Sequence, residues 1–544
     1  MFRYENRVRF VGMLLVGALA WTQSASAADA PGRVEGVVKS SAGQPLAGAF
    51  VKLKNADRRL TFMVISQEQG RYTAADLPPG KYTVQGVGNG FESAWSSPVD
   101  VPSGGAAKLD LSLTNKMGPM MPASWPGRIP EAAEVDLNLP EGPGKQIVTA
   151  HCIGCHDSER IIRTRTARKR WQNNVDSMRQ NIRNQGLKDM TEDDAKTLVD
   201  YFATNFPPVA NYDDNSRLPR TLLQGKARKY RVVQYDLPND AAEPHDVASD
   251  PYGNGWVNQR TGGKLGRLDG KTLEYREISL PPGKSDIARP GNLQIDSNGL
   301  AWLPDASSDR RWLSLDTKTE VFKSYPFPTS IRGGPNGNSF AVHPDGSIWS
   351  SGPGAARRLD PATGEFKTFD APTWLQTKQN PGGYGIAIDG DGKVWFAEDG
   401  ADKMAKVDPA TGTVQEFRIP VTGRIYPRRM GTDGEGDIWV GLWNSGRLMK
   451  IDAQSNEMST YAPPTATAGP YSVHVDQTNN LIYVSFQQVD KIARFDPATE
   501  EWVEYPLAES ESDTRRIEVD KTNPKRIWWS STVTGRMGFI DILD

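Results

Sequence analysis

Residues 385–412 read GIAIDGDGKVWFAEDGADKMAKVDPATG, and this stretch decides the fold of the C-terminal half. It contains three short apolar runs, at 386–389, 393–396 and 404–407, which are separated by turns rich in Asp and Gly. A fourth run follows at 414–417. Four short strands joined by tight turns predict one antiparallel sheet of the kind that forms a β-propeller blade.

The same pattern recurs seven times along the chain. Aromatic anchors in the second strands are spaced 44 to 47 residues apart, and aspartates that close the third strands keep the same period. The anchors are Trp256, Trp302, Trp349, Trp395, Trp439, Tyr483 and Trp528, and the aspartates are Asp269, Asp316, Asp360, Asp408, Asp452, Asp496 and Asp541. This period, with four strands per repeat, predicts a seven-bladed β-propeller over 225–544.

The seventh repeat lacks its fourth strand. Residues 230–237, YRVVQYDL, match the outer strands of other repeats, such as EYREISL at 274–280 and EWVEYPL at 501–507. We therefore expect this N-terminal strand to complete the last blade and close the ring.

The N-terminus has the pattern of a signal peptide. Arg3, Arg7 and Arg9 precede a short apolar run, and Ala25-Ser26-Ala27 is a small-residue cleavage site. We predict a signal peptide at 1–27 and a periplasmic or secreted protein, which does not span a membrane after cleavage because the apolar run is too short. The 64 basic and 66 acidic residues give a net charge of -2, which argues against a nucleic-acid partner.

Residues 28–114 alternate apolar and polar positions between Gly- and Pro-containing turns, which predicts a β-sandwich. The stretches VEGVVKSSAGQPLAGAFVKL and GRYTAADLPPGKYTV resemble the carboxypeptidase regulatory-like family. This resemblance implies a non-catalytic spacer or adhesion unit. The Pro- and Met-rich segment 115–140 is expected to be a linker.

A C-x-x-C-H motif follows the linker, at Cys152-Ile153-Gly154-Cys155-His156. In an exported chain this motif predicts one covalently bound haem c, with thioether bonds to Cys152 and Cys155 and with His156 as an axial iron ligand. Helices are predicted at 144–150 and 192–205 from capping and apolar spacing. The segment resembles class I cytochromes c, which implies a small all-α cytochrome c domain over 141–210, followed by a connector at 211–224.

Methionine is the natural second axial ligand, because His151 is too close to the motif to reach the opposite haem face. Met190 precedes Thr191, the expected N-cap of the last helix, but is also suited to a hydrophobic staple there. The spacing from Trp171 to Met178 resembles dehydrogenase-associated cytochromes, which implies Met178 as the ligand. We favour Met178 and keep Met190 as the alternative.

A basic run follows the haem motif. It is equally well interpreted as a solvated face or as a site for an acidic redox partner or for haem propionates. Its members are Arg160, Arg163, Arg165, Arg168, Lys169 and Arg170.

The propeller repeats resemble the streptogramin (virginiamycin B) lyase family, most clearly at 385–412. That resemblance implies a metal-assisted C–O lyase that uses a Glu-x-His pair and another His one blade earlier, around a divalent metal. Glu243-Pro244-His245 matches the pair, but Arg515 stands at the position of the other His. The lyase element is therefore incomplete.

Alignment of the repeats places one group of residues where the first strands begin, which is where a propeller converges on its central funnel. The group comprises His245, Tyr384, Arg428, Tyr471 and Arg515. Arginines with aromatic neighbours suit an anionic or aromatic small molecule, because guanidinium binds carboxylates bidentately.

Three functions remain open at this point. The first is an oxidoreductase whose propeller binds the small molecule and whose haem passes electrons to a soluble or membrane-bound redox partner. The second is a lyase of the streptogramin type with an accessory cytochrome. The third is a non-enzymatic module for electron transfer or partner binding. The fold class expected for all three is multidomain, with a β-sandwich, a small all-α cytochrome c domain and a seven-bladed β-propeller.

Overall fold

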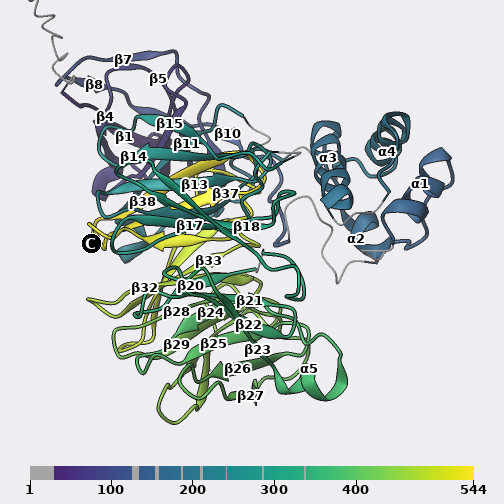
Figure 1. Ribbon diagram of the computed structural model, residues 1–544. Coiled ribbons are helices and arrows are strands. Elements are labelled where there is room, and N and C mark those ends of the chain that lie inside the picture. Colours follow the sequence, from purple (N-terminus) through teal and green to yellow (C-terminus); the bar gives the residue numbers. More distant parts are fainter. Residues whose placement is uncertain are drawn as a thin grey trace, which may run out of the picture.

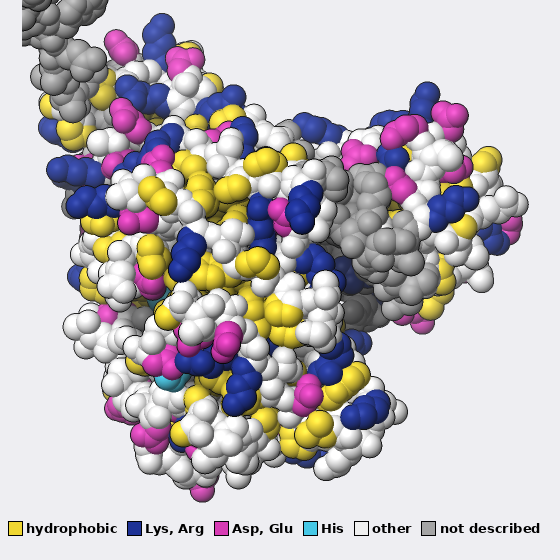
Figure 2. Space-filling view, in the orientation of Figure 1, with side chains coloured by type: hydrophobic (Ala, Val, Ile, Leu, Met, Phe, Trp, Pro, Cys, Tyr) yellow, Lys and Arg dark blue, Asp and Glu magenta, His cyan; other side chains and the backbone are white. Residues whose placement is uncertain are grey.

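The computed structural model describes residues 30–124, 134–153, 158–184, 188–208, 212–239, 242–284, 287–335 and 338–544. The predicted signal peptide lies outside the described residues. Figure 1 shows a small β-domain against one side of a large body of sheets, and a group of helices beside that body. None of the described helices is long and apolar enough to cross a membrane. Figure 2 shows basic and acidic side chains interspersed over the visible face.

The ring consists of four-stranded antiparallel sheets, as the repeat predicts. Blade 1 consists of β12 (Pro244–Ser249), β13 (Asn254–Gln259), β14 (Lys264–Asp269) and β15 (Tyr275–Ser279). Blade 2 consists of β16 (Gln294–Ile295), β17 (Leu300–Asp305), β18 (Arg311–Asp316) and β19 (Phe322–Pro326). Blade 3 consists of β20 (Phe340–Val342), β21 (Ile348–Gly352), β22 (Ala355–Leu359) and β23 (Phe366–Asp370), and helix α5 (Pro372–Thr377) follows it.

Blade 4 consists of β24 (Ile386–Ile388), β25 (Val394–Glu398), β26 (Lys403–Val407) and β27 (Val414–Arg418). Blade 5 consists of β28 (Pro427–Thr432), β29 (Ile438–Leu442), β30 (Arg447–Ile451) and β31 (Met458–Tyr461). Blade 6 consists of β32 (Pro470–Asp476), β33 (Leu481–Phe486), β34 (Lys491–Asp496) and β35 (Glu501–Pro506). Blade 7 contributes β36 (Ile517–Val519), β37 (Arg526–Ser531) and β38 (Arg536–Ile542).

The recurring tryptophans anchor the first turn of their blades. The indole Nε1 of fully buried Trp395 donates to Asp389 Oδ2 at 2.9 Å, and Asp389 Oδ1 accepts the backbone N–H of Lys393 at 2.8 Å. A buried indole N–H needs an acceptor, and this aspartate supplies one while it closes the turn. The same pair occurs as Trp256–Asp250, Trp302–Asp296, Trp439–Asp433 and Trp528–Asp520. In blade 3, His343 stands at the position of the aspartate, and Trp349 Nε1 donates to Ser347 Oγ at 3.0 Å instead.

Strand β11 (Tyr230–Asp236) closes the ring, which confirms the prediction for 230–237. It pairs with β38 along its whole length, from Tyr230 opposite Ile542 to Asp236 opposite Arg536. Its other edge pairs with β3 (Leu60–Ile65) of the N-terminal domain. One continuous ten-stranded sheet therefore joins blade 7 to that domain, a connection that the repeat pattern does not predict.

The N-terminal domain is a β-sandwich-like pair of sheets. One sheet contains β1 (Gly32–Ser40), β4 (Arg71–Leu77), β8 (Ala106–Lys108) and β9 (Leu111–Leu113); the other continues from β3 into β2 (Phe50–Asn55), β5 (Gly80–Gly88), β6 (Phe91–Glu92), β7 (Val99–Val101) and β10 (Asn115–Lys116). Short 3-10 turns occur at Glu68–Gly70 and Gly225–Arg228. Apolar residues of both sheets share a core with blade 7 and blade 1.

Residues 143–206 form what we call the helical unit. Its helices are α1 (Pro143–His151), α2 (Ser158–Arg163), α3 (Arg168–Asn184) and α4 (Glu192–Asn205), which confirms both predicted helices. Helices α1 and α4 touch at Gly144, where a Cβ atom would lie only 2.2 Å from Tyr201 Cγ. Thr191 caps α4 in a reciprocal capping box with Asp194.

Arg217 binds the two chain segments that precede and follow the helical unit. Arg217, whose side chain is 4% exposed, pairs with Asp490 of the propeller (Nε to Oδ2, 3.0 Å). The same guanidinium donates to the backbone carbonyls of Met121 at 3.3 Å and Ser124 at 3.1 Å, and also to that of Pro122. This arrangement, here called the clasp, holds the segment before the helical unit against the segment after it.

Blade 4 places a carboxyl group where blade 1 has an amide. Glu398 ends β25 opposite Lys403, in the register that Gln259 has opposite Lys264 in blade 1. Gln259 Nε2 donates to Glu277 Oε1 at 2.8 Å. Within the described chain, neither side-chain oxygen of the fully buried Glu398 has a hydrogen-bond partner. Burial, together with the charge of the nearby Glu416, raises the pKa of Glu398 to about 8.

Glu398 should therefore make the stability of the propeller depend on pH. With its pKa raised from 4.5 to about 8, the folded state binds more protons than the unfolded chain between these values, so stability falls as pH rises through that window. We expect Glu398→Gln to stabilise the protein by up to about 4 kcal/mol at pH 9 and by less than about 1 kcal/mol at pH 5. Urea unfolding at the two pH values measures this difference.

The reciprocal variant Gln259→Glu is the matched control, and it should destabilise the protein more at pH 9 than at pH 5. An effect of Glu398→Gln that is equal at both pH values would contradict the assignment.

Candidate functional site

The residues predicted at the starts of the first strands lie at one end of the ring, which we call the funnel. Tyr384, Arg428 and Tyr471 form an aromatic cage around a cation. The Arg428 guanidinium lies 4.2 Å from the ring centroid of Tyr384, 5.3 Å from that of Tyr471 and 4.0 Å from that of Tyr426. The hydroxyls of Tyr384 and Tyr471 share a hydrogen bond. The prediction that these side chains converge is confirmed for this group.

Arg428 is buried but only weakly neutralised. Its Nη1 lies 3.7 Å from Asp399 Oδ2, beyond ordinary hydrogen-bonding distance, and its Nε has no partner among the described residues. Burial raises the pKa of Asp399, and the Arg428 charge opposes that rise. Asp399 also lines a cavity of about 350 Å³ together with Asn338 and Asn380.

A buried ion pair crosses the centre of the ring. Asp246 of blade 1 accepts two hydrogen bonds from Arg429 of blade 5, at 2.8 and 2.9 Å, and both side chains are at most 3% exposed. Asp246 Oδ1 also lies 2.7 Å from His245 Nδ1. Burial opposes ionisation of Asp246, but Arg429 holds the pKa of this carboxyl far below its usual range. Burial and the charge of Arg260 lower the pKa of His245, so its imidazole is neutral near pH 7.

Several arginine charges act on Glu243. Its backbone adopts φ 49°, a left-handed conformation that non-glycine residues rarely use. Burial raises the pKa of Glu243, and the charges of Arg260 and Arg515 are the strongest opposing influences. Arg170, from helix α3 of the helical unit, also acts on this carboxyl. The funnel charges therefore come from two parts of the protein.

Four funnel residues were not predicted from the sequence, although their spacing from the aromatic anchors indicates them. Each lies four residues after the aromatic anchor of its blade, where the second strand reaches the funnel; they are Arg260, Asp399, Trp443 and Gln487. Trp443 Nε1 donates to Gln487 Oε1 at 2.7 Å, and Gln487 donates to Asp513. Asp513 Oδ2 in turn accepts from Arg515 Nε at 3.0 Å. Counting from the anchors would have identified this second ring.

The predicted haem residues are only partly described. Cys155 and His156 lie outside the described residues. Cys152 follows the last residue of α1, and it packs half-buried against the apolar core of the helical unit. Met178 is 39% exposed on α3, whereas Met190 is 4% exposed and shares that core with Ala195, the partner expected of a hydrophobic staple.

The basic run divides into side chains with different environments. Arg163 is buried and pairs with Glu159 at 2.6 Å, and exposed Arg168 pairs with Asp200. The Arg165 guanidinium lies 4.8 Å from the ring centroid of Phe206. Arg170 is half-buried, and its Nη1 has no hydrogen-bond partner among the described residues. The run is therefore not one continuous solvated face.

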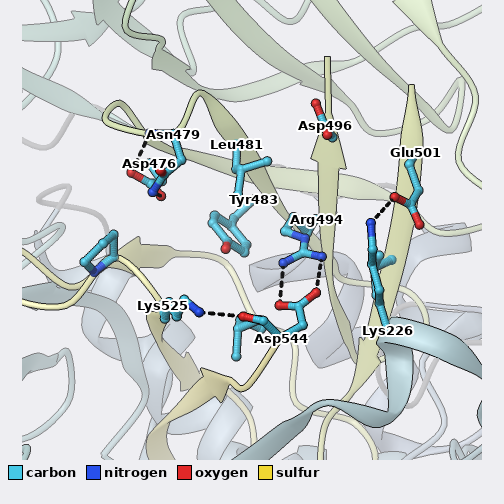
Figure 3. Close-up of a pocket in the computed structure, with 13 residues that line it drawn as sticks. Lys226, Asp476, Asn479, Leu481, Tyr483, Arg494, Asp496, Glu501, Lys525 and Asp544 are labelled. Carbon is cyan, nitrogen blue, oxygen red and sulfur yellow. Dashed lines mark hydrogen bonds and ion pairs between the residues drawn. The ribbon is translucent and has the colours of Figure 1, made fainter. Parts of the chain in front are cut away.

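A separate cavity of about 440 Å³ lies at the seam between blades 6 and 7 (Figure 3). Its charged groups neutralise one another. Arg494 makes two hydrogen bonds to Asp544, at 2.9 and 2.7 Å, and Lys226 pairs with Glu501 at 2.5 Å. We therefore place the candidate site in the funnel, where Arg428 is not neutralised in this way.

Replacement of Asp246 tests the central ion pair. Asp246→Asn leaves Arg429 buried without a counter-charge, and we expect a loss of about 3–5 kcal/mol of unfolding free energy, measured by urea denaturation. Glu320→Gln, which removes the partner of Arg276 in an exposed pair on the same propeller, should cost less than about 1 kcal/mol. Equal losses in the two variants would show that the Asp246–Arg429 pair does not organise the funnel.

Two segments of the chain match known protein families. Residues 33–114 match the carboxypeptidase regulatory-like domain, and residues 315–543 match the virginiamycin B lyase family. A search of curated proteins gave no match.

Several solved structures share the fold of the propeller. Virginiamycin B lyase from Staphylococcus aureus is 18% identical, with a TM-score of 0.50 over 58% of this chain and 100% of its own. A streptogramin B lyase is 19% identical, with a TM-score of 0.51 over 59% and 100%. A catalytically inactive variant of the Staphylococcus aureus enzyme, solved with quinupristin, gives 18%, 0.50, 58% and 100%. The chain thus combines a carboxypeptidase regulatory-like domain with a virginiamycin B lyase-like β-propeller domain.

Proposed function

We propose that this protein is an exported, haem-c-dependent oxidoreductase. Its propeller binds a small anionic substrate, preferentially an aromatic one, and its helical unit carries the redox group. Electrons then leave to a soluble or membrane-bound carrier in the periplasm or outside the cell. The observation that carries the proposal is the position of Arg170. This residue belongs to the helical unit, which bears the C-x-x-C-H motif. Its Nη1 is shielded from solvent without a hydrogen-bond partner among the described residues, and its charge lowers the pKa of Glu243 at the funnel.

The residues of the helical unit fit a covalently bound haem. Cys152 lies at the end of α1 beside an apolar core that includes Trp171 and Phe202, whose ring centroids are 4.5 Å apart. With Cys155 it would form the two thioether bonds, and His156 together with Met178 or Met190 would bind the iron. The chain has only these two cysteines, so their use here excludes a disulfide with any other residue. A haem c at this place would supply one-electron transfer.

The charge of the funnel selects the substrate class. Burial raises the pKa of Glu243, and the charges of four arginines oppose this rise, namely Arg260, Arg515, Arg289 and Arg170. A buried excess of guanidinium groups is stabilised by a carboxylate, which can accept two hydrogen bonds from each of them. The tyrosines and Trp443 next to this charge provide flat apolar faces for an aromatic ring.

A lyase of the streptogramin type is the second candidate, because 315–543 match that family and Glu243-Pro244-His245 has the Glu-x-His pattern. Such chemistry would use a divalent metal held by Glu243 and His245. The charges around these two residues oppose it, since Arg260 and Arg515 would repel a cation. Asp246 also occupies His245 Nδ1, which leaves Nε2 as the remaining ligand atom. A propeller that only recognises a redox partner is the third candidate.

The absorption spectrum of the purified, oxidised protein tests the proposal. We expect 4-hydroxybenzoate or 3,4-dihydroxybenzoate to reduce the haem, and Arg260→Ala to slow this reduction at least about 10-fold through loss of a charged hydrogen bond. Arg276→Ala, on the outside of the same blade, should leave the rate unchanged, and dithionite should reduce all three proteins equally.

Two other outcomes favour the remaining candidates. Haem reduction at equal rates in wild type and Arg260→Ala would mean that the funnel does not bind the reductant. Metal-dependent cleavage of a streptogramin without any change in the haem spectrum would favour the lyase.

A further inference from the structure

We propose that a cavity between blades 2 and 3 binds a small alkylammonium compound, whose chain lies on Trp302 and whose ammonium group pairs with Asp316. The cavity has a volume of about 570 Å³ and is also lined by Leu300, Ser314 and Tyr325. Strand β17 begins there and β18 ends there, so the cavity lies at the end of the ring opposite the funnel. This site is therefore independent of the proposed function.

In six of the seven blades, a large side chain of the third strand stands directly opposite the aromatic anchor, on the same face of the sheet. These side chains are Arg267, Arg358, Lys406, Lys450, Arg494 and Phe539. In blade 2 the residue opposite Trp302 is Ser314, whose side chain is too short to cover an indole ring. Since Ser314 and Trp302 both line the cavity, the cavity lies where the other blades have a large side chain.

Five of these six side chains are cations, and two of them show how the place is filled. The Lys406 ammonium lies 5.0 Å from the ring centroid of Trp395 and donates to the Ala453 carbonyl of the next blade at 3.1 Å. Lys450 Nζ lies 5.8 Å from the ring centroid of Trp439. An alkyl chain on the indole with a cation at its end thus fits this place, because the ring attracts the charge and the chain covers apolar surface.

Blade 2 also keeps a carboxylate that a lysine neutralises in blade 4. In blade 4, Lys393 Nζ lies 2.9 Å from Asp408 Oδ2. In blade 2, Leu300 stands opposite the equivalent aspartate, Asp316. Asp316 Oδ1 accepts two backbone N–H groups of the turn that follows, at 2.9 and 3.0 Å, and these bonds lower the pKa of the carboxyl. Asp316 is therefore charged near pH 7, and it makes no ion pair with any described residue.

Lys323 lines the cavity from β19 but does not take the missing place. Its ammonium lies 4.8 Å from the ring centroid of Tyr325 and donates to the Pro361 carbonyl of blade 3 at 3.2 Å. These contacts hold it on the side of the outer strand. A second cation can therefore pair with Asp316 while Lys323 keeps its own partners.

The size and the walls of the cavity select the kind of ligand. Small-molecule sites measure roughly 300–1,000 Å³, and this cavity falls within that range. Leu300, Trp302, Val321 and Tyr325 provide apolar walls, and Asp316 provides one charge. A linear amine covers these walls and neutralises the carboxylate. A neutral apolar compound would leave Asp316 unpaired, and an anion would be repelled by it.

Isothermal titration of the full-length protein with n-hexylammonium, 1-hexanol and hexanoate tests the inference. We expect n-hexylammonium to bind about 5-fold more tightly than 1-hexanol, and hexanoate to bind most weakly. Asp316→Asn should remove the difference between n-hexylammonium and 1-hexanol, because the amide oxygen still accepts the two backbone N–H groups but carries no charge. Asp452→Asn, at the equivalent aspartate of blade 5, is the matched control and should change none of the affinities.

Filling the cavity from within is the second arm of the test. Ser314→Lys installs the kind of side chain that blades 4 and 5 have at this position, and it should abolish n-hexylammonium binding. Ser314→Met fills the same place without a charge and should also abolish binding. The urea midpoint of both variants should be no lower than that of wild type, which shows that blade 2 still folds.

The contrary outcomes are distinct. Equal n-hexylammonium affinity in wild type and in both folded Ser314 variants would overturn the site, and so would absence of binding to wild type at millimolar concentrations. Equal affinity in wild type and Asp316→Asn would overturn the pairing with the carboxylate. Tighter binding of Nα-acetyl-lysine amide than of n-hexylammonium would assign the cavity to a lysine side chain of a partner protein and overturn the small-molecule ligand. Haem reduction, which tests the funnel, bears on none of these results.

Discussion

The architecture depends on the two edges of one strand. Strand β11 pairs with β38 on one side and with β3 on the other, so its seven residues close the propeller and five of them, 231–235, also attach the N-terminal domain. A propeller blade normally ends at an outer strand with a free edge, which is a liability for edge-to-edge aggregation. Here the sandwich covers that edge in blade 7. The carboxypeptidase regulatory-like domain is consequently part of the scaffold that holds the funnel in shape.

Much of the fold could be predicted because its determinants are local and repeated. The anchor period gave the blades, and Thr191 with its acidic first turn gave helix α4. The matching outer-strand pattern gave the closing strand at 230–237. The pairing of β3 with β11 could not be predicted, because any exposed edge of alternating residues is compatible with it. Pairing between distant edges depends on how the domains are placed in space, which periodicity does not encode.

The residues of the funnel could be predicted only in part. Residues at the starts of the first strands followed from the repeat, and the cage of Tyr384, Arg428 and Tyr471 formed as expected. Arg260 was not predicted, because the alignment of the repeats considered the starts of the first strands and not the ends of the second strands. Arg170 was noticed only as part of a basic run, since no sequence pattern indicates that a helix from another part of the chain lies beside a propeller.

The clasp at Arg217 attaches the helical unit to the rest of the protein at both of its ends. Ser124 and Arg217 are 93 positions apart in sequence and are joined by a hydrogen bond of 3.1 Å, so the two ends of the segment that contains the helical unit are held together. A unit tethered at both ends meets its neighbour as an intramolecular partner, at an effective concentration on the order of millimolar. Contacts too weak to hold a separate protein therefore suffice to keep the helical unit beside the propeller.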